Sequence, residues 1–338
     1  MDEGDDGECL PGLFDEEEAC RWAAAPQTLH SEGGWSVIQS RRPSGRLARW
    51  LVTTRDGATS LDQTRVELQP GEADAPDVFV RDKLNASSHQ TMALLVALSL
   101  RLPVAASTPL VCVLGGGGLA LPMALLAADP ALQVFVVERD PVATDLAMRF
   151  FGASTAVAEG RLRVEAADAL AFVQGGGVPQ PAVALFVDVD FLRGGSPPPA
   201  ALLSVEFWAA AWRSVQPYNG VIAVNCIGAS PGAAEALAVV ALQAAKVASR
   251  EAELAAGLLE PAGAAATRPW TPLVPRPSLL VLGAPSLLGI LGGPPDALAG
   301  EALEAAPWAR ALAAGLLRDL EAGEGLLASW RQLPPPPC

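Results

Sequence analysis

Short apolar runs alternate with longer amphipathic segments through the middle of the chain. The runs have the length of strands buried on both faces of a sheet, and they cover residues 110–114, 134–137, 162–165, 184–187 and 221–225. Segments with apolar residues at helical spacing lie between them, at 119–128, 141–151, 202–215 and 232–245. This alternation predicts an α/β fold with a mostly parallel, doubly wound sheet and helices on both faces. We also expect a lead-in helix at 88–102 and further strands at 246–251 and 278–283.

The pattern changes on both sides of this region. β-rich runs separated by Arg-Pro-Ser-Gly and Arg-Asp-Gly turns predict a small antiparallel meander over residues 34–80. Residues 1–28 hold an acid cluster and few large apolar residues, so we expect a flexible acidic arm. The Rossmann-like domain is assigned to 84–285, with an alanine- and proline-rich insertion at 254–277 that should lack regular structure. Helices near 299–330 and a proline-rich tail complete the segment 286–338.

Four consecutive glycines, residues 115–118, follow the first of the core strands, and the next strand ends on Glu138. Glycine has no Cβ, so a ligand can approach the backbone closely at such a turn. A carboxylate at the neighbouring strand end can accept from two vicinal ribose hydroxyls. Gly115, Gly117, Gly118 and Glu138 are therefore candidate cofactor-binding residues. The alternative is a turn with a purely structural role.

Acids also follow the later strands, Asp168 after the third and Asp188 and Asp190 after the fourth. Ligands of open α/β sheets bind at this edge. A dehydrogenase explains Glu138 but not the other acids, whereas an S-adenosylmethionine-dependent methyltransferase accounts for all of them. In that class Asp168 contacts the adenine amine, and Asp188 and Asp190 are catalytic residues facing the methyl group. Asp168 also has the position of a helix N-cap, and the alternative for the pair is a solvated strand end.

Two further polar residues belong to the candidate site. Asn225 ends the fifth strand and could line a substrate pocket beside Asp190, whose charge would orient a substrate ammonium. His89 lies near the start of the lead-in helix. It is a candidate for substrate binding or catalysis, with a plain polar helix start as the alternative. No metal-binding residues are expected.

Composition restricts the partners. The formal charge is −14 and the pI is about 4.6, and no cluster of Lys and Arg is present, which argues against a nucleic-acid surface. The five cysteines lack paired spacing and the N-terminus is acidic, so we expect reduced thiols, no signal peptide and a cytoplasmic location. Residues 102–128 carry no charge, but their glycines and prolines argue against a membrane span.

Five stretches resemble one known family. They are residues 49–52 with 63–68, 88–93, 115–122, 137–141 with 150–152, and 186–190 followed by 197–200. The most discriminating is Asp188-Val-Asp190 combined with Pro-Pro-Pro-Ala at 197–200. On these residues the chain resembles the spermidine-synthase-like fold. Within that fold it is similar to the C-terminal domain of the methyltransferase-like protein 13 family, over about Trp35 to Gly283.

The resemblance implies S-adenosyl-L-methionine as cofactor and the N-terminal α-amine of elongation factor 1-alpha as substrate, and it leaves a homodimer open. Polyamine synthases carry a further acid where this chain has Phe191. Aminopropyl transfer is therefore the second hypothesis. Leu119 replaces a glycine of the family's loop. This departure and the 254–277 insertion motivate a third hypothesis, a non-catalytic interaction module.

Overall fold

The computed structural model describes residues 26–41, 45–55, 59–71, 77–81, 84, 87–100, 108–189, 200–226, 231–248, 255–259, 279–283 and 331–332. Within these residues the central element is an eight-stranded sheet of order β13-β11-β12-β10-β9-β6-β7-β8. The strands are β6 (Leu110–Leu114), β7 (Gln133–Glu138), β8 (Leu162–Ala166), β9 (Ala184–Val187), β10 (Val221–Asn225), β11 (Ala255–Leu259), β12 (Leu279–Gly283) and β13 (Arg331–Gln332). The five strands from β6 to β10 are parallel, whereas β12, β11 and β13 pair antiparallel. The predicted doubly wound, mostly parallel sheet is confirmed.

Helices cover both faces of this sheet because its parallel strands are apolar on both faces. The helices α2 (Ser87–Ser99) and α3 (Ala120–Ala128) pack on the face that carries Val111 and Val113. The other face, with Cys112, packs against α6 (Ala169–Gln174), α7 (Val205–Val215) and α8 (Pro231–Ala248). None of the described helices combines the length and apolar character needed to cross a lipid bilayer.

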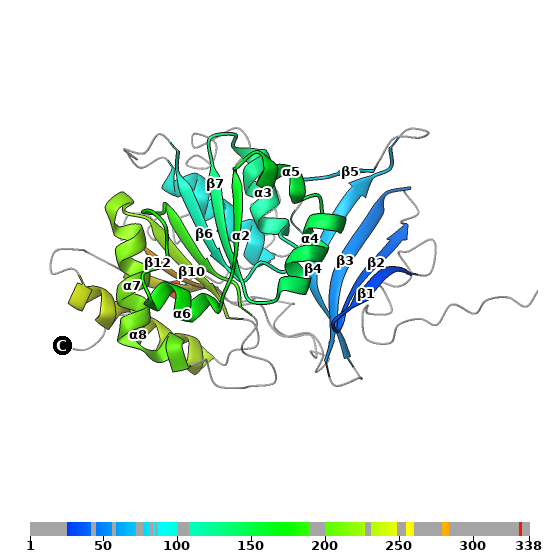
Figure 1. Ribbon diagram of the computed structural model, residues 1–338. Helices are drawn as coiled ribbons and strands as arrows, with labels where there is room; N and C mark the ends of the chain where they lie inside the picture. Colours follow the sequence, from blue (N-terminus) through cyan, green and yellow to red (C-terminus); the bar gives the residue numbers. More distant parts are fainter. Residues whose placement is uncertain are drawn as a thin grey trace, which may run out of the picture.

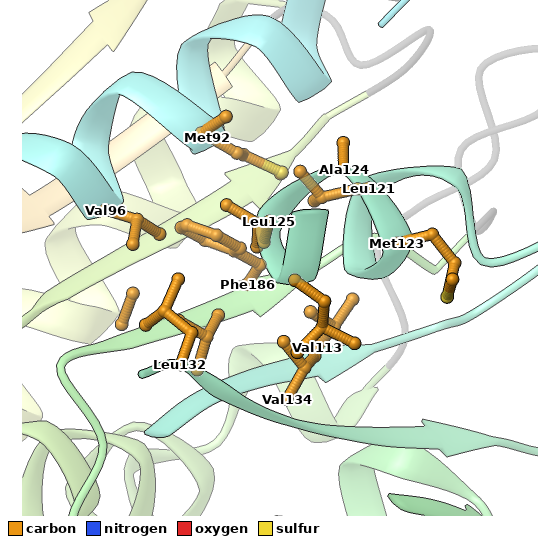
Figure 2. Packing of buried hydrophobic residues seen from close by; sticks show 14 of the residues in the cluster. Met92, Val96, Val113, Leu121, Met123, Ala124, Leu125, Leu132, Val134 and Phe186 are labelled. Carbon is orange, nitrogen blue, oxygen red and sulfur yellow. The ribbon is translucent and has the colours of Figure 1, made fainter. Parts of the chain in front are cut away.

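Figure 2 shows the first of these two layers. Met92 and Val96 of α2 and Leu125 of α3 pack against side chains of the sheet, including Phe186 of β9. On the opposite face the aromatic side chains of α7, Phe207, Trp208 and Trp212, are buried as core residues. Burial of such side chains contributes roughly 1.5–3 kcal/mol each, so the two layers hold the strand ends in fixed register.

A second sheet, formed before the first core helix, contains β1 (Gln27–Glu32), β2 (Trp35–Arg41), β3 (Leu47–Arg55), β4 (Thr59–Gln69) and β5 (Val78–Phe79). The strands pair antiparallel in sequence order, as a meander does. The predicted meander is therefore confirmed. The strand β1 was not predicted, and it begins inside the segment that we assigned to the acidic arm.

The helices α3 and α4 (Pro141–Phe150) lie between the two sheets (Figure 1). Leu51 and Leu68 of the N-terminal sheet pack against Leu146 of α4 in one apolar cluster. Polar contacts reinforce the junction, since Trp35 Nε1 donates to Asp140 Oδ2 at 2.8 Å. The backbone amide of Gly118 also donates to Thr64 Oγ1, at 2.8 Å. The N-terminal sheet thus contacts the glycine turn directly.

Two expectations for the C-terminal half need correction. Residues 255–259 lie in the stretch expected to lack regular structure, yet they form β11 between β12 and β13. Alanine and glycine have low strand propensity, so only tertiary pairing on both sides reveals this strand. The expected strand at 246–251 is wrong at its start, because α8 continues to Ala248. Residues 331–332 of the tail form β13, and the helices expected near 299–330 lie outside the described residues.

Thr64→Val should destabilise the junction between the two sheets. Valine has nearly the shape of threonine but no acceptor, so the buried amide of Gly118 would lose its partner, which costs about 1–3 kcal/mol. Urea unfolding should show a loss of this size in the free energy of unfolding. The matched variant Thr64→Ser keeps the acceptor and should lose less. A Thr64→Val protein as stable as the parent would contradict this account.

Candidate active site

The carboxyl ends of the parallel strands meet at one edge of the central sheet. From β10 to β8 this edge carries Asn225, Asp188, Gly115, Glu138 and Asp168, each at the end of its strand or within two residues after it. These five residues were predicted from separate parts of the sequence, and the strand order places them in one row. Asp190, the remaining predicted acid, lies outside the described residues.

Gly115 is at the point where the chain leaves β6, with φ +93°. A Cβ at this position would overlap the backbone carbonyl oxygen of Asp188, the first residue after β9. Only glycine fits here, both because of the positive φ and because of the neighbouring backbone. The glycine turn and the end of β9 are therefore in direct contact.

The carboxylate of Glu138 organises the glycine turn from the neighbouring strand. Its Oε2 accepts from the backbone amides of Gly116 at 2.8 Å and Gly117 at 3.1 Å, and its Oε1 accepts from the amide of Asp140 at 2.9 Å. Each carboxylate oxygen can accept two hydrogen bonds, so Oε1 keeps capacity for a further donor. Sequence analysis did not single out Gly116, although it belongs to the glycine run that carried the prediction.

The second half of the turn faces inward. Gly118 is buried and its amide is bound by Thr64, so the structure gives it a packing contact with the N-terminal sheet. Leu119 has φ 61° and ψ 26°, a left-handed conformation that glycine adopts readily. Its side chain is buried with the core of α2 and α3. Thr64 was missed because its position in an upstream strand carries no signal for contact with the turn.

Asp168 acts as the N-cap of α6. Its Oδ1 accepts from the backbone amide of Ala171 at 2.9 Å, which is the hydrogen bond expected of an N-cap residue. The residue is exposed at the same edge as Glu138. The capping interpretation of Asp168 is confirmed, and one carboxylate oxygen lies outside this bond.

Asp188, His89 and Asn225 form a hydrogen-bonded trio. His89 Nε2 lies 2.7 Å from Asp188 Oδ2, and Asn225 Nδ2 donates to Asp188 Oδ1 at 2.7 Å. The side chains of His89 and Asp188 are only 16% and 20% exposed. Three elements distant in sequence, α2, β9 and β10, supply these groups. The structure thus brings together three residues that the sequence nominated separately.

The environment of Asp188 favours its ionised form. Burial raises the pKa of this carboxyl, but the charge of His89 and the hydrogen bonds from His89 and Asn225 outweigh burial and hold the pKa below its ordinary value of 3.8. Asn225 Oδ1 is buried and accepts no hydrogen bond from any residue that the structure describes. A buried acceptor without a donor is unfavourable by about 1–3 kcal/mol, so the trio can take up one more N–H or O–H group.

The described residues around this edge form no metal site, and the Cys112 thiol is unreactive. Among the described ranges, no group of three or more His, Cys, Asp and Glu side chains is placed to hold a metal ion. Cys112 and Cys226 are buried, and neither forms a disulfide bond within the described part of the chain. Burial raises the pKa of the Cys112 thiol to about 12, so this thiol stays protonated and unreactive.

Comparison with known proteins gives structural resemblances only. No family model and no curated protein matches the sequence. Spermidine synthase from Thermotoga maritima is 14% identical over 76% of this chain and 72% of its own, with a TM-score of 0.45. Human methyltransferase-like protein 13 in complex with SAH is 24% identical over 69% of this chain and 93% of its own, with a TM-score of 0.42. The O-methyltransferase TomG from Streptomyces achromogenes in complex with SAM is 15% identical over 64% and 92%, with a TM-score of 0.39.

Asp188→Asn should change how stability depends on pH. A carboxyl whose pKa is lowered on folding stabilises the protein above its unfolded pKa of about 3.9, and this contribution disappears as the pH falls through the lowered folded value. The difference in the free energy of unfolding between parent and Asp188→Asn should be large near pH 5–6 and shrink below about pH 4. Denaturant unfolding across this range tests it. A difference that grows toward low pH would show that Asp188 is not stabilised as an anion.

Leu119→Gly tests which contribution to stability is larger at this position, the strain of the left-handed backbone or the burial of the leucine side chain. Relief of the left-handed conformation should stabilise the variant by about 1–2 kcal/mol, whereas loss of a buried leucine side chain costs about 2–5 kcal/mol. Burial should dominate, and the free energy of unfolding should fall by about 1–3 kcal/mol. Thermal unfolding of the two proteins measures this change. A more stable variant would mean that strain dominates at this turn.

Proposed function

We propose that this chain is an S-adenosylmethionine-dependent methyltransferase that methylates an amine, namely the N-terminal α-amine of elongation factor 1-alpha. The observation that carries the proposal is the contact between the glycine turn and the end of β9. Because of this contact, the ends of β6 and β7, where the glycine turn and Glu138 could bind a nucleoside, lie directly beside the polar trio of Asp188, His89 and Asn225. The bound cofactor would supply an electrophilic methyl group, and the trio would lie next to it.

The residues at the edge fit such a cofactor. The spare acceptor capacity of Glu138 Oε1 suits a ribose hydroxyl, and a second hydroxyl could replace one of the glycine amides on Oε2. Gly115 and Gly117, both with positive φ, leave backbone accessible at the turn. Asp168, exposed at the next strand end, would accept from the adenine amine with the oxygen that is not engaged by Ala171. Gly118 would act indirectly, by fixing the turn against Thr64.

The trio and Asp190 suit an amine substrate. A substrate ammonium is attracted by the ionised Asp188 and by Asp190, and Asn225 Oδ1 offers a buried acceptor for one N–H. An α-amine has an ordinary pKa of about 7.7–8.0 against about 10.4 for lysine, so its nucleophilic neutral form is more accessible near neutral pH. Positioning of that amine against the methyl group would then account for most of the rate enhancement over the uncatalysed reaction.

The direct test supplies the full chain with S-adenosylmethionine and elongation factor 1-alpha carrying a free N-terminus. Mass spectrometry of the N-terminal peptide should show methyl groups on the α-amine. Parallel reactions contain putrescine with decarboxylated S-adenosylmethionine. Formation of spermidine without protein methylation would favour the aminopropyltransferase hypothesis, and cofactor binding without turnover on any amine would favour an interaction module.

Glu138→Ala and Asp190→Ala should separate cofactor binding from turnover. Charge-assisted hydrogen bonds contribute about 1.5–3 kcal/mol, so Glu138→Ala should weaken cofactor binding roughly ten- to a hundredfold. Asp190→Ala should leave binding nearly intact and abolish turnover, because this acid is expected to face the amine. Calorimetric dissociation constants and methylation rates measure both effects. Equal loss of cofactor affinity in the two variants would place Asp190 in the cofactor site instead.

A further inference from the structure

The carboxylate of Glu138 is connected to the N-terminal sheet through Asp140. Trp35 Nε1, on β2, donates to Asp140 Oδ2 at 2.8 Å, and the backbone amide of Asp140 donates to Glu138 Oε1 at 2.9 Å. We propose that Trp35 is a positioning residue for cofactor binding, which acts through Asp140 to fix the orientation of the Glu138 carboxylate. This inference rests on the S-adenosylmethionine-dependent function proposed above, in which Glu138 binds the ribose.

The side chain of Asp140 is fixed by a different donor on each oxygen. Its Oδ1 accepts from the backbone amide of Val142 at 2.9 Å, as the N-cap of α4, and its Oδ2 accepts from Trp35. The N-cap bond alone would leave the carboxylate able to turn about that one contact. Because the side chain and the amide belong to the same residue, the indole bond also helps to fix the direction of the N–H that Glu138 Oε1 accepts.

The indole of Trp35 is itself held by packing. It is half-buried against the apolar cluster that contains Val37 of β2 and Leu146 of α4. The turn that precedes Trp35 also lies on α4, since a Cβ at Gly33 would be 3.3 Å from Val142 Cγ2. The N-terminal sheet therefore directs the indole N–H toward the start of α4.

The far end of α4 is bound to the same sheet. Arg49 Nη1, on β3, donates to the carbonyl oxygen of Phe150 at 2.6 Å, and Arg81 Nη2, which follows β5, donates to that of Phe151 at 2.8 Å. The last carbonyls of a helix lack partners within the helix, so these guanidinium groups satisfy them and hold α4 in place. The hydrogen bond of Trp35 is at the opposite end, so its loss should disturb the strand end without releasing the helix.

The consequence for the cofactor follows from the geometry at Glu138. Its Oε1 holds the amide of Asp140 and keeps capacity for one ribose hydroxyl. If that amide is displaced, the carboxylate must be reordered when the cofactor binds, and ordering a group on binding lowers affinity. The polar trio at β9 and β10 has no contact with Trp35, so turnover of the loaded enzyme should be retained.

Trp35→Phe removes the indole N–H and keeps an aromatic ring in the cluster. Calorimetry should show S-adenosylmethionine binding weakened about three- to thirtyfold, with a methylation rate at saturating cofactor close to that of the parent. Asp140→Ser removes the same hydrogen bond from the other side and keeps an N-cap oxygen, so its loss of affinity should be similar. The matched control is Trp50→Phe, the same substitution in β3, where Trp50 belongs to a separate apolar cluster. This control should bind cofactor as the parent does.

The Glu138→Ala background tests whether Trp35 acts through Glu138. In that background Trp35→Phe should weaken cofactor binding by less than about twofold more, because only independent sites are expected to give additive losses. Losses that add in the double variant would overturn the inference. A loss in Trp50→Phe equal to that in Trp35→Phe would also overturn it, since the effect would then be general destabilisation of the sheet.

Hydrogen exchange of the cofactor-free protein separates this inference from the proposed function. Exchange of the Asp140 amide should be faster in Trp35→Phe than in the parent and unchanged in Trp50→Phe. Unchanged exchange at Asp140 in Trp35→Phe would overturn the inference. A parent that binds cofactor but methylates no amine would defeat the proposed function alone, because the effect of Trp35 on binding is still measured. A parent that binds no S-adenosylmethionine would defeat both.

Discussion

The contact between the glycine turn after β6 and the backbone that follows β9 is the constraint on which the candidate site depends. Parallel strands that are neighbours in a sheet end at the same edge. At Gly115 the absence of a Cβ lets the carbonyl of Asp188 approach the turn directly. The acid of β7 and the trio at β9 and β10 are consequently parts of one continuous edge rather than two separate sites.

The partly buried carboxylates at this edge are hydrogen-bonded within the protein. Glu138 accepts from backbone amides of its own loop and of the glycine turn, and Asp188 accepts from two side chains on other elements. Both carboxylates are fixed before any ligand arrives, so little reorganisation is needed at the moment of binding. Asn225 Oδ1 is the exception, because it is buried and accepts no hydrogen bond from the described residues. A ligand that donates a hydrogen bond to this oxygen would therefore stabilise the site.

The N-terminal sheet contributes to the site through the turn. Thr64 binds the amide of Gly118, and Asp140, which follows Glu138 closely in sequence, is bound both by Trp35 and as the N-cap of α4. These contacts connect the antiparallel sheet to the strand ends that carry the candidate chemistry. The N-terminal sheet therefore holds the glycine turn in place, in addition to covering α4.

The sequence by itself determined the layered α/β architecture, because apolar runs of strand length alternate with amphipathic segments, and periodicity is a local property. It also nominated Gly115, Glu138, Asp168, Asp188 and Asn225, because glycine and polar residues near predicted strand ends are visible locally, and His89, near the start of a predicted helix. Only the tertiary structure decided that β11 is a strand, because Ala-Ala-Gly-Leu-Leu has no strong preference and gains its pairing from β12 and β13. Likewise only the fold brought His89 within hydrogen-bond distance of Asp188 and gave Leu119 a left-handed backbone inside the core. Such pairings join residues from distant elements, and no spacing along the chain encodes them.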